Sequence, residues 1–206
     1  MLATALFSNL RFYKTLSSNT WRFKASMAAV SGSKTHSRKG VLAVSLVLCL
    51  GSASTSWALD TPEGSVILTI SGNIEHSNAT VNGEPVAQFD HDMLQAIGRH
   101  TTHTSTPWHE GSMMFEGPLM RDVLAEVGAQ GERLIAIALN DYEADIPVVD
   151  AVEYDVILAT HANELPMSVR EHGPTFVIYP FDDHPELHQE VIYSRSAWQV
   201  NRLIVE

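Results

Sequence analysis

The densest group of potential metal ligands in this sequence lies in one short segment near its carboxyl end. Residues 182–188 read Asp-Asp-His-Pro-Glu-Leu-His, which places His184 and His188 four residues apart. Side chains with that spacing share one face of a helix, and Pro185 would be tolerated in its first turn. Imidazole and carboxylate groups can bind zinc or copper without any cysteine. We therefore predict His184 and His188 as metal ligands, with a solvated acidic loop as the alternative interpretation.

The rest of the chain holds no motif that identifies a reaction. It contains neither a nucleophile elbow nor a glycine-rich phosphate loop. His100 and His103 fall in a segment with strand alternation, so their side chains would point to opposite faces. The carboxylates of Asp141, Glu143 and Asp145 could perform acid–base chemistry if their environments separated their pKa values. An exposed turn is the simpler interpretation of those three residues.

One segment has the composition of a small-molecule pocket. It contains Trp108, His109, Met113, Met114 and Phe115. Aromatic and methionine side chains with a few polar neighbours are typical of ligand pockets. The same residues are equally typical of core packing, and both interpretations stay open.

Short strands and two helices must position these residues. Asp90 can cap a helix that runs to Arg99, and Pro118 can begin a second helix that Gly128 ends. Asn82-Gly83 predicts a tight turn. Apolar or alternating runs predict strands at residues 66–70, 100–106, 134–139, 145–149, 156–159, 176–179 and 203–205. The fold class we predict is α+β, with a mixed β-sheet or barrel-like core and flanking helices.

A break in composition divides the chain. The first 59 residues contain no Asp or Glu, whereas the rest holds all 24 acidic residues and no Lys, for a formal charge of −18. An apolar stretch at 41–51 follows basic residues and precedes the small residues Ser56 and Ala58. We predict that residues 1–58 are a targeting segment that is removed, and that 59–206 is a single domain in the bacterial periplasm or secreted. An uncleaved anchor, a transit peptide and a start at Met27 are the alternatives.

The composition of the mature chain also bounds its chemistry. The only cysteine, Cys49, lies in the apolar stretch, so residues 59–206 can form neither a disulfide nor a thiolate metal site. The acidic charge opposes binding to nucleic acid and to anionic membrane surfaces. We expect a small-molecule ligand and, among proteins, a basic partner surface.

Several segments, taken in their order along the chain, resemble one known family. They are Trp108 with Gly111, the run Phe115-Glu116-Gly117-Pro118-Leu119, Asn140-Asp141-Tyr142 followed by Ile146-Pro147, His172-Gly173-Pro174 followed by residues 177–180, and Trp198. Their order over residues 66–206 resembles the sulfite-oxidase-like oxidoreductase molybdopterin-binding domain. The resemblance implies that family's fold and a molybdopterin cofactor. It also implies cofactor-binding residues at Thr104, Trp108, His109, Arg170 and His172.

The residues that hold the cofactor in that family are replaced here. A cysteine thiolate binds molybdenum in the family, and the matching position, four residues before Trp108, holds Thr104. A neutral hydroxyl cannot replace a thiolate on such a metal. An arginine that often faces the cofactor is replaced by Thr175 and Phe176, and a lysine before the last tryptophan by Ala197. The pterin phosphate would need cationic partners, for which only arginines such as Arg170, Arg195 and Arg202 are present.

Three hypotheses for function follow. The leading one is an exported domain of the molybdopterin-binding fold that has lost its molybdenum ligand and acts as a non-catalytic small-molecule-binding or accessory module. The second is a genuine molybdopterin-dependent oxidoreductase that holds its cofactor without cysteine, through Thr104 and arginines. The third is a divalent-metal-binding exported protein that uses His184 and His188.

Overall fold

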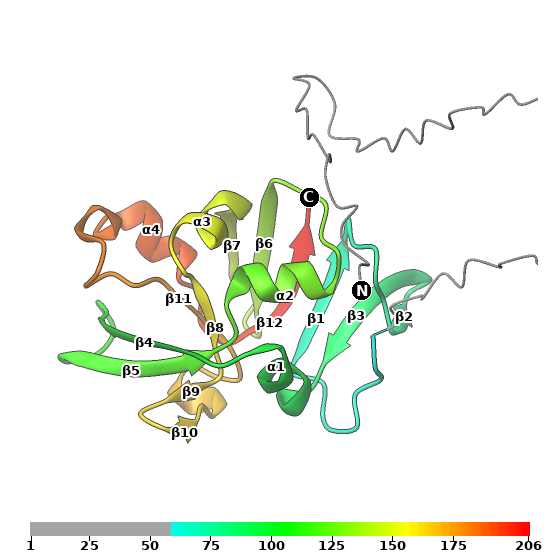
Figure 1. Ribbon diagram of the computed structural model, residues 1–206, viewed down its shortest axis with the longest axis horizontal. Coiled ribbons are helices and arrows are strands. Elements are labelled where there is room, and N and C mark those ends of the chain that lie inside the picture. Colours follow the sequence, from blue (N-terminus) through cyan, green and yellow to red (C-terminus); the bar gives the residue numbers. More distant parts are fainter. Residues whose placement is uncertain (1–58) are drawn as a thin grey trace, which may run out of the picture. The chain divides into compact units, whose positions relative to one another are not determined.

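The computed structural model describes residues 59–206, in which three β-sheets are flanked by four short α-helices (Figure 1). The predicted targeting segment, residues 1–58 with Cys49, lies outside the described residues. Within 59–206, no helix is both long enough and apolar enough to cross a membrane.

The largest sheet has six strands in the order β2-β3-β1-β12-β6-β7. β1 and β12 pair in parallel and the other neighbours are antiparallel, so the sheet is mixed. The last strand, predicted near 203–205, therefore lies inside the sheet. The strands are β1 (Leu68–Gly72), β2 (Ala79–Val81), β3 (Glu84–Phe89), β6 (Arg133–Ala138), β7 (Glu143–Pro147) and β12 (Val200–Val205).

The predicted turn and both predicted helices are present. Asn82 and Gly83 have φ of 54° and 89°, the left-handed pair that a two-residue hairpin between β2 and β3 requires. Asp90 caps α1 (His91–Ile97) because its carboxylate accepts the Met93 N–H at 2.9 Å. That hydrogen bond, with others from backbone N–H groups, lowers the pKa of Asp90. α2 (Met120–Glu126) buries one face against the core, so the α+β class with flanking helices is confirmed.

Two further helices differ from the sequence prediction. The strand predicted at 145–149 stops at Pro147, and α3 (Val148–Glu153) begins there. Two β-branched valines at its start favoured a strand, but Pro147 cannot donate a hydrogen bond to a ladder. α4 (Glu190–Arg195) was not predicted, because only Ile192 of its residues is buried and the apolar periodicity is weak.

A second layer carries a long hairpin. A four-stranded sheet has the order β10-β9-β5-β4, and β8 pairs with β11 beside it. The hairpin of β4 and β5 reaches from the layer toward α4, with residues 106–111 at its tip (Figure 1). The strands are β4 (His100–Ser105), β5 (Ser112–Gly117), β8 (Ile157–Ala159), β9 (His161–Ala162), β10 (Leu165–Pro166) and β11 (Phe176–Ile178).

The two layers enclose separate apolar cores. The larger core lies between the six-stranded sheet and the helices. The smaller one contains Phe115, Phe176 and Ile178, with Trp108 and Trp198 packed against it. The aromatic residues of the predicted pocket therefore belong to the second core and to its surface.

A buried ionic contact fixes α3 and α4. The carboxylate of Asp150, only 6% exposed, accepts hydrogen bonds from the Tyr179 hydroxyl at 2.7 Å and from Arg195 Nη1 at 2.8 Å. Burial, with the neighbouring carboxylate, raises the pKa of Tyr179, so its hydroxyl stays protonated. Asp150 thereby holds the end of α4 against α3 and the strand segment that contains Tyr179.

We predict that Asp150→Ala lowers the free energy of unfolding by about 2–3 kcal/mol, because it leaves the buried Tyr179 hydroxyl and the partly buried Arg195 guanidinium without a partner. Tyr179→Phe should cost only about 1 kcal/mol, since it removes one hydrogen bond. Urea denaturation followed by circular dichroism measures both. Glu153→Ala, an exposed change on the same helix, is the control. Equal losses for Asp150→Ala and Glu153→Ala would contradict the prediction.

Candidate functional site

Most residues implied by the family resemblance meet around one phenylalanine ring. Phe176 on β11 is fully buried, and its ring centroid lies 5.8 Å from that of Trp108, 6.4 Å from His109 and 5.7 Å from His172. Phe115 at 6.0 Å and Trp198 at 6.3 Å complete this aromatic cluster. Such pairs stabilise a structure by about 0.5–1.5 kcal/mol each beyond their buried area. The cluster joins the β4–β5 hairpin, the loop before β11 with the strand itself, and the segment before β12.

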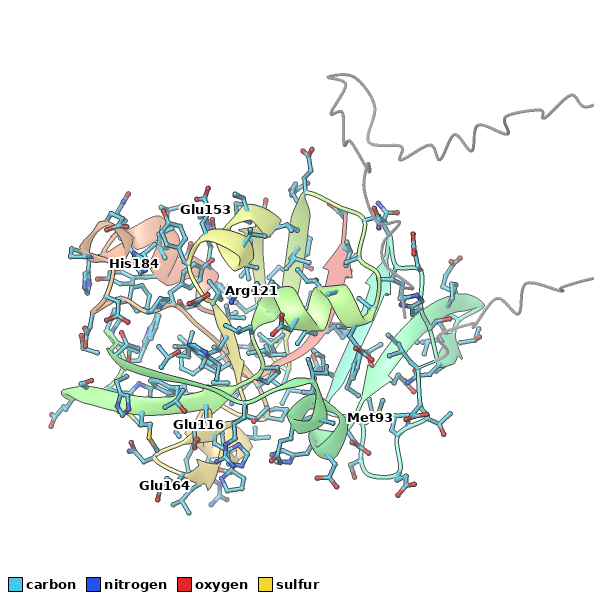
Figure 2. The ribbon with its side chains drawn as sticks, viewed as in Figure 1. Met93, Glu116, Arg121, Glu153, Glu164 and His184 are labelled. Atoms are coloured by element: carbon cyan, nitrogen blue, oxygen red, sulfur yellow. The ribbon has the colours of Figure 1, made fainter. Side chains whose placement is uncertain are left out.

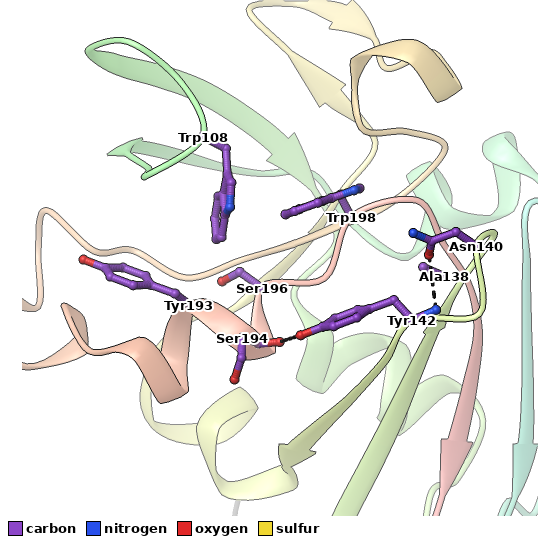
Figure 3. A pocket seen from close by; sticks show the side chains of 8 residues that line it. All are labelled: Trp108, Ala138, Asn140, Tyr142, Tyr193, Ser194, Ser196 and Trp198. Carbon is purple, nitrogen blue, oxygen red and sulfur yellow. Dashed lines mark hydrogen bonds between the residues drawn. The ribbon is translucent and has the colours of Figure 1, made fainter.

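The first of two pockets beside the cluster is the tryptophan pocket, a cavity of about 310 Å³. Figure 3 shows Trp198 on one side of the cavity and Tyr142 on the other, with Trp108 and Tyr193 closing one end. No lining residue carries a charge; the lining consists of Trp108, Ala138, Asn140, Tyr142, Tyr193, Ser194, Ser196 and Trp198. This volume fits a small ligand.

The second is the histidine pocket, a cavity of about 350 Å³. Three of the predicted residues line it, namely His109, Arg170 and His172. The rings of His109 and His172 are 4.9 Å apart, and both belong to the aromatic cluster. Glu171 also lines this pocket and places a carboxylate beside Arg170 in the chain. The structure thus brings together Trp108, His109, His172 and Arg170 but divides them between two pockets.

The environment of His109 favours the neutral imidazole. Burial lowers the pKa of His109, and the positive charge that His172 can carry lowers it further. Its Nδ1 lies 2.8 Å from the Thr106 hydroxyl, which can donate a hydrogen bond to it. At neutral pH His109 therefore contributes no positive charge to the histidine pocket.

Thr104 lies away from both pockets. It is fully buried, and its hydroxyl accepts the Asp182 N–H at 3.2 Å and donates to the Ser105 carbonyl at 3.2 Å. The Asp182 carboxylate in turn accepts the Ser105 N–H at 2.9 Å and the Ser105 hydroxyl. These contacts form a latch between the end of β4 and the loop after β11. The hydroxyl of Thr104, which the family resemblance implied as a cofactor-binding group, therefore binds the backbone at Ser105 and Asp182.

The arginines of the described residues are mostly neutralised. Five of the six pair with carboxylates, as Arg99–Glu116, Arg121–Asp155, Arg133–Asp145, Arg195–Asp150 and Arg202–Asp141. Arg170 is the one for which the described residues show no ion pair, and it shares its pocket with Glu171. With a buried threonine for the thiolate and one arginine for the phosphate, these residues do not fit a molybdopterin centre.

The predicted metal ligands point to different partners. His184 Nδ1 lies 3.2 Å from a Glu186 carboxylate oxygen, whereas His188 Nδ1 lies 2.9 Å from the Tyr193 hydroxyl. The segment between them is a 3-10 turn, Pro185–Leu187, rather than an α-helix. Figure 2 shows His184 on the segment that precedes α4. In residues 59–206 no three His, Asp or Glu side chains gather in a way that could hold a metal ion.

Some residues of the tryptophan pocket had no sequence signal. Tyr193 and Ser196 come from α4 and its end, an element that the apolar pattern did not predict. Trp198 and Tyr142 were used only as markers of the family resemblance. Tyr142 and Trp198 are far apart in sequence and line the same pocket only because of the strand order, which no local pattern reveals.

Comparison with known proteins supports the family resemblance. Residues 81–180 match the family of the oxidoreductase molybdopterin binding domain. Among 28 matching chains of solved structures is the sulfane dehydrogenase SoxCD from Paracoccus pantotrophus, with 20% identity and a TM-score of 0.48. That match covers 67% of this chain and 37% of the SoxCD chain, so this chain corresponds to well under half of its length. A search of curated proteins found no match.

We predict that Thr104→Val lowers the free energy of unfolding by about 1–3 kcal/mol, because it leaves the Asp182 N–H without its acceptor. Two valine substitutions on the same strand are the matched controls. Thr101 is exposed, and the buried Thr102 hydroxyl has no hydrogen-bond partner. Thr101→Val should change stability little, and Thr102→Val should be neutral or stabilising. Denaturant titration measures all three, and the same loss at each position would refute the latch.

We also predict that stability falls as the pH drops from about 7 to about 5.5. The unfolded chain protonates His109 near its ordinary pKa of 6.5, while burial keeps the folded pKa lower, so protons favour the unfolded state in this range. His109→Gln should reduce the slope of unfolding free energy against pH. His103→Gln, an exposed change, should leave the slope as it is. An unchanged slope in His109→Gln would show that the pKa of His109 is the same in the folded and the unfolded protein, which would contradict the prediction.

Proposed function

Because residues 81–180 match the family of the oxidoreductase molybdopterin binding domain, we propose that this chain uses the fold as a non-catalytic small-molecule-binding or accessory module whose molybdenum ligand has been lost. One observation carries the proposal: Thr104, at the position of the metal thiolate, is buried and its hydroxyl binds the backbone at Asp182 and Ser105. A side chain in that role offers no open coordination position.

The replacement of the family's arginine supports the same conclusion. The resemblance puts Thr175 and Phe176 where the family often has a cation toward the cofactor, and the ring of Phe176 fills the centre of the aromatic cluster. A phosphate at that place would meet aromatic rings instead of positive charge, at a large cost in desolvation. The acidic domain, with a formal charge of −18, would oppose an anion further.

The tryptophan pocket is the place where we propose that the ligand binds. Its walls are aromatic, and its few polar side chains are the amide of Asn140 and the hydroxyls of Ser194, Ser196 and the two tyrosines. Pockets of this composition take small organic molecules. The ring of Trp108 links the pocket to the aromatic cluster, so a bound ligand would contact the part of the fold that replaced the cofactor's partners.

The second candidate function, a molybdopterin-dependent oxidoreductase, is supported by Arg170. It lines the histidine pocket without an ion pair among the described residues, so it could receive a phosphate in a genuine molybdopterin-dependent oxidoreductase. In that case His109 and His172 would flank the cofactor. The third candidate, a divalent-metal-binding protein, would use His184 and His188.

Export is part of the proposal. Residues 1–58 would direct the chain out of the cytoplasm and be removed, leaving the cysteine-free acidic domain in the periplasm or the medium. Its charge favours protein partners with basic surfaces. Sequencing the amino terminus of the exported protein tests this proposal, since cleavage after Ala58 would give Leu59 as the first residue.

The test is elemental analysis with pterin fluorescence on the full chain, expressed in a bacterium that makes molybdopterin and recovered from its exported fraction. A molybdopterin enzyme expressed in parallel shows that the host supplies the cofactor. We expect less than one tenth of a molybdenum atom or pterin per chain, roughly the level of chance carry-over.

Stoichiometric molybdenum with pterin would overturn the proposal in favour of the oxidoreductase. Arg170→Ala should then release the pterin. Stoichiometric zinc or copper would favour the metal-binding alternative, and this metal should be lost from the double variant His184→Ala/His188→Ala.

A further inference from the structure

The tryptophan pocket has one unsatisfied polar atom in its wall. Ser196 is 1% exposed, and its Oγ has no hydrogen-bond partner in the structure. Its backbone N–H is already used at the end of α4, where it donates to the carbonyls of Ile192 and Tyr193. Buried hydroxyls are nearly always paired, so an unpaired one on a residue that lines a cavity is available to a polar group that enters the cavity.

The other walls of the pocket are aromatic rings set nearly at right angles. Trp108 and Trp198 have centroids 5.5 Å apart and planes inclined by 67°. Trp108 and Tyr193 are 6.3 Å apart and inclined by 81°. Tyr142 lies across the cavity from Trp198 (Figure 3), and its hydroxyl donates to the Ser194 carbonyl at 2.8 Å. Parallel plates would suit a flat ring, whereas perpendicular walls suit a compact, rounded group.

The charges around the pocket exclude an anion and favour a cation. No lining residue is charged. Arg195, between two lining serines in the chain, is neutralised by Asp150 at 2.8 Å. An anion would therefore be desolvated without a cationic partner. A cation would gain from the electron-rich faces of the tryptophan and tyrosine rings and from the net charge of the domain.

We infer that the tryptophan pocket binds a small organic ammonium ion, with its cationic head among Trp108, Trp198 and Tyr142 and a polar substituent at Ser196 Oγ. This inference rests on the proposed function, because it names the ligand class of the same pocket. The cavity of about 310 Å³ has room for an alkylated ammonium group with a short polar chain.

Fluorescence titration tests the inference directly. Trp108 and Trp198 are the only tryptophans in residues 59–206, and both line the pocket. The exported protein is titrated with choline, an alkylated ammonium ion with a hydroxyl group, and with 3,3-dimethyl-1-butanol, its neutral analogue of the same shape. We expect a saturable change in emission with choline and roughly tenfold weaker binding of the neutral analogue.

Substitutions in the tryptophan pocket separate the contributions of the aromatic rings and of the Ser196 hydroxyl to choline binding. Tyr142 is 45% exposed, so replacing it should leave the fold intact. Tyr142→Leu should weaken choline binding several-fold more than Tyr142→Phe, because only phenylalanine keeps an aromatic face. Ser196→Ala should remove the advantage of choline over tetramethylammonium, which lacks the hydroxyl. Val149→Ala, an exposed change on α3, is the control.

Two outcomes would overturn the inference. Equal affinity for choline and its neutral analogue would show that the pocket selects shape rather than charge, and the proposed small-molecule function would stand. No emission change with either compound at millimolar concentration would exclude an ammonium site. The proposed function would then still be judged by the molybdenum and pterin content, which this titration does not measure.

Discussion

The ring of Phe176 is the contact on which the candidate site depends. It is fully buried on β11, and five other aromatic rings lie with their centroids within 6.4 Å of its own. Those rings come from the β4–β5 hairpin, from the loop before β11 and from the segment before β12. Without a large apolar side chain at this position, these three segments would lack a common surface to pack on, and the rings of Trp108, His109 and His172 that line the two pockets would lose their shared neighbour.

That one ring also sets the chemistry of the region. The aromatic side chain of Phe176 makes the centre of the site apolar. The buried hydroxyl of Thr104 completes the change, because it ties β4 to the backbone at Asp182 and offers nothing to a metal. In the function we propose, the two residues act together: Phe176 brings no positive charge to the site, and Thr104 links two backbone segments instead of binding a metal. What remains is a fold with aromatic pockets in an acidic domain.

Local patterns were sufficient for much of the fold. The Asp90 cap, the Asn82-Gly83 turn and the helix from Pro118 to Gly128 each rest on residues a few positions apart, and each is present. α3 and α4 were missed because their residues are β-branched or mostly exposed, and a buried contact to Asp150 holds them instead. A tertiary interaction of this kind leaves no periodic signal in the sequence.

In the candidate site too, some residues could be predicted from the sequence and others depend on tertiary contacts. The family resemblance led to Trp108, His109 and His172, which meet around Phe176. Ser196 and Tyr193 had no signal, because their role depends on how α4 is placed against the hairpin. The segment between His184 and His188 forms a 3-10 turn, Pro185–Leu187, and not the α-helix on which their shared face depended.

We propose that this protein holds no molybdopterin. Native mass spectrometry of the exported protein is the most direct test. We expect the mass of the polypeptide alone, or with a small adduct that contains neither phosphate nor metal. A mass increased by a pterin cofactor, with the isotope pattern of molybdenum, would contradict it.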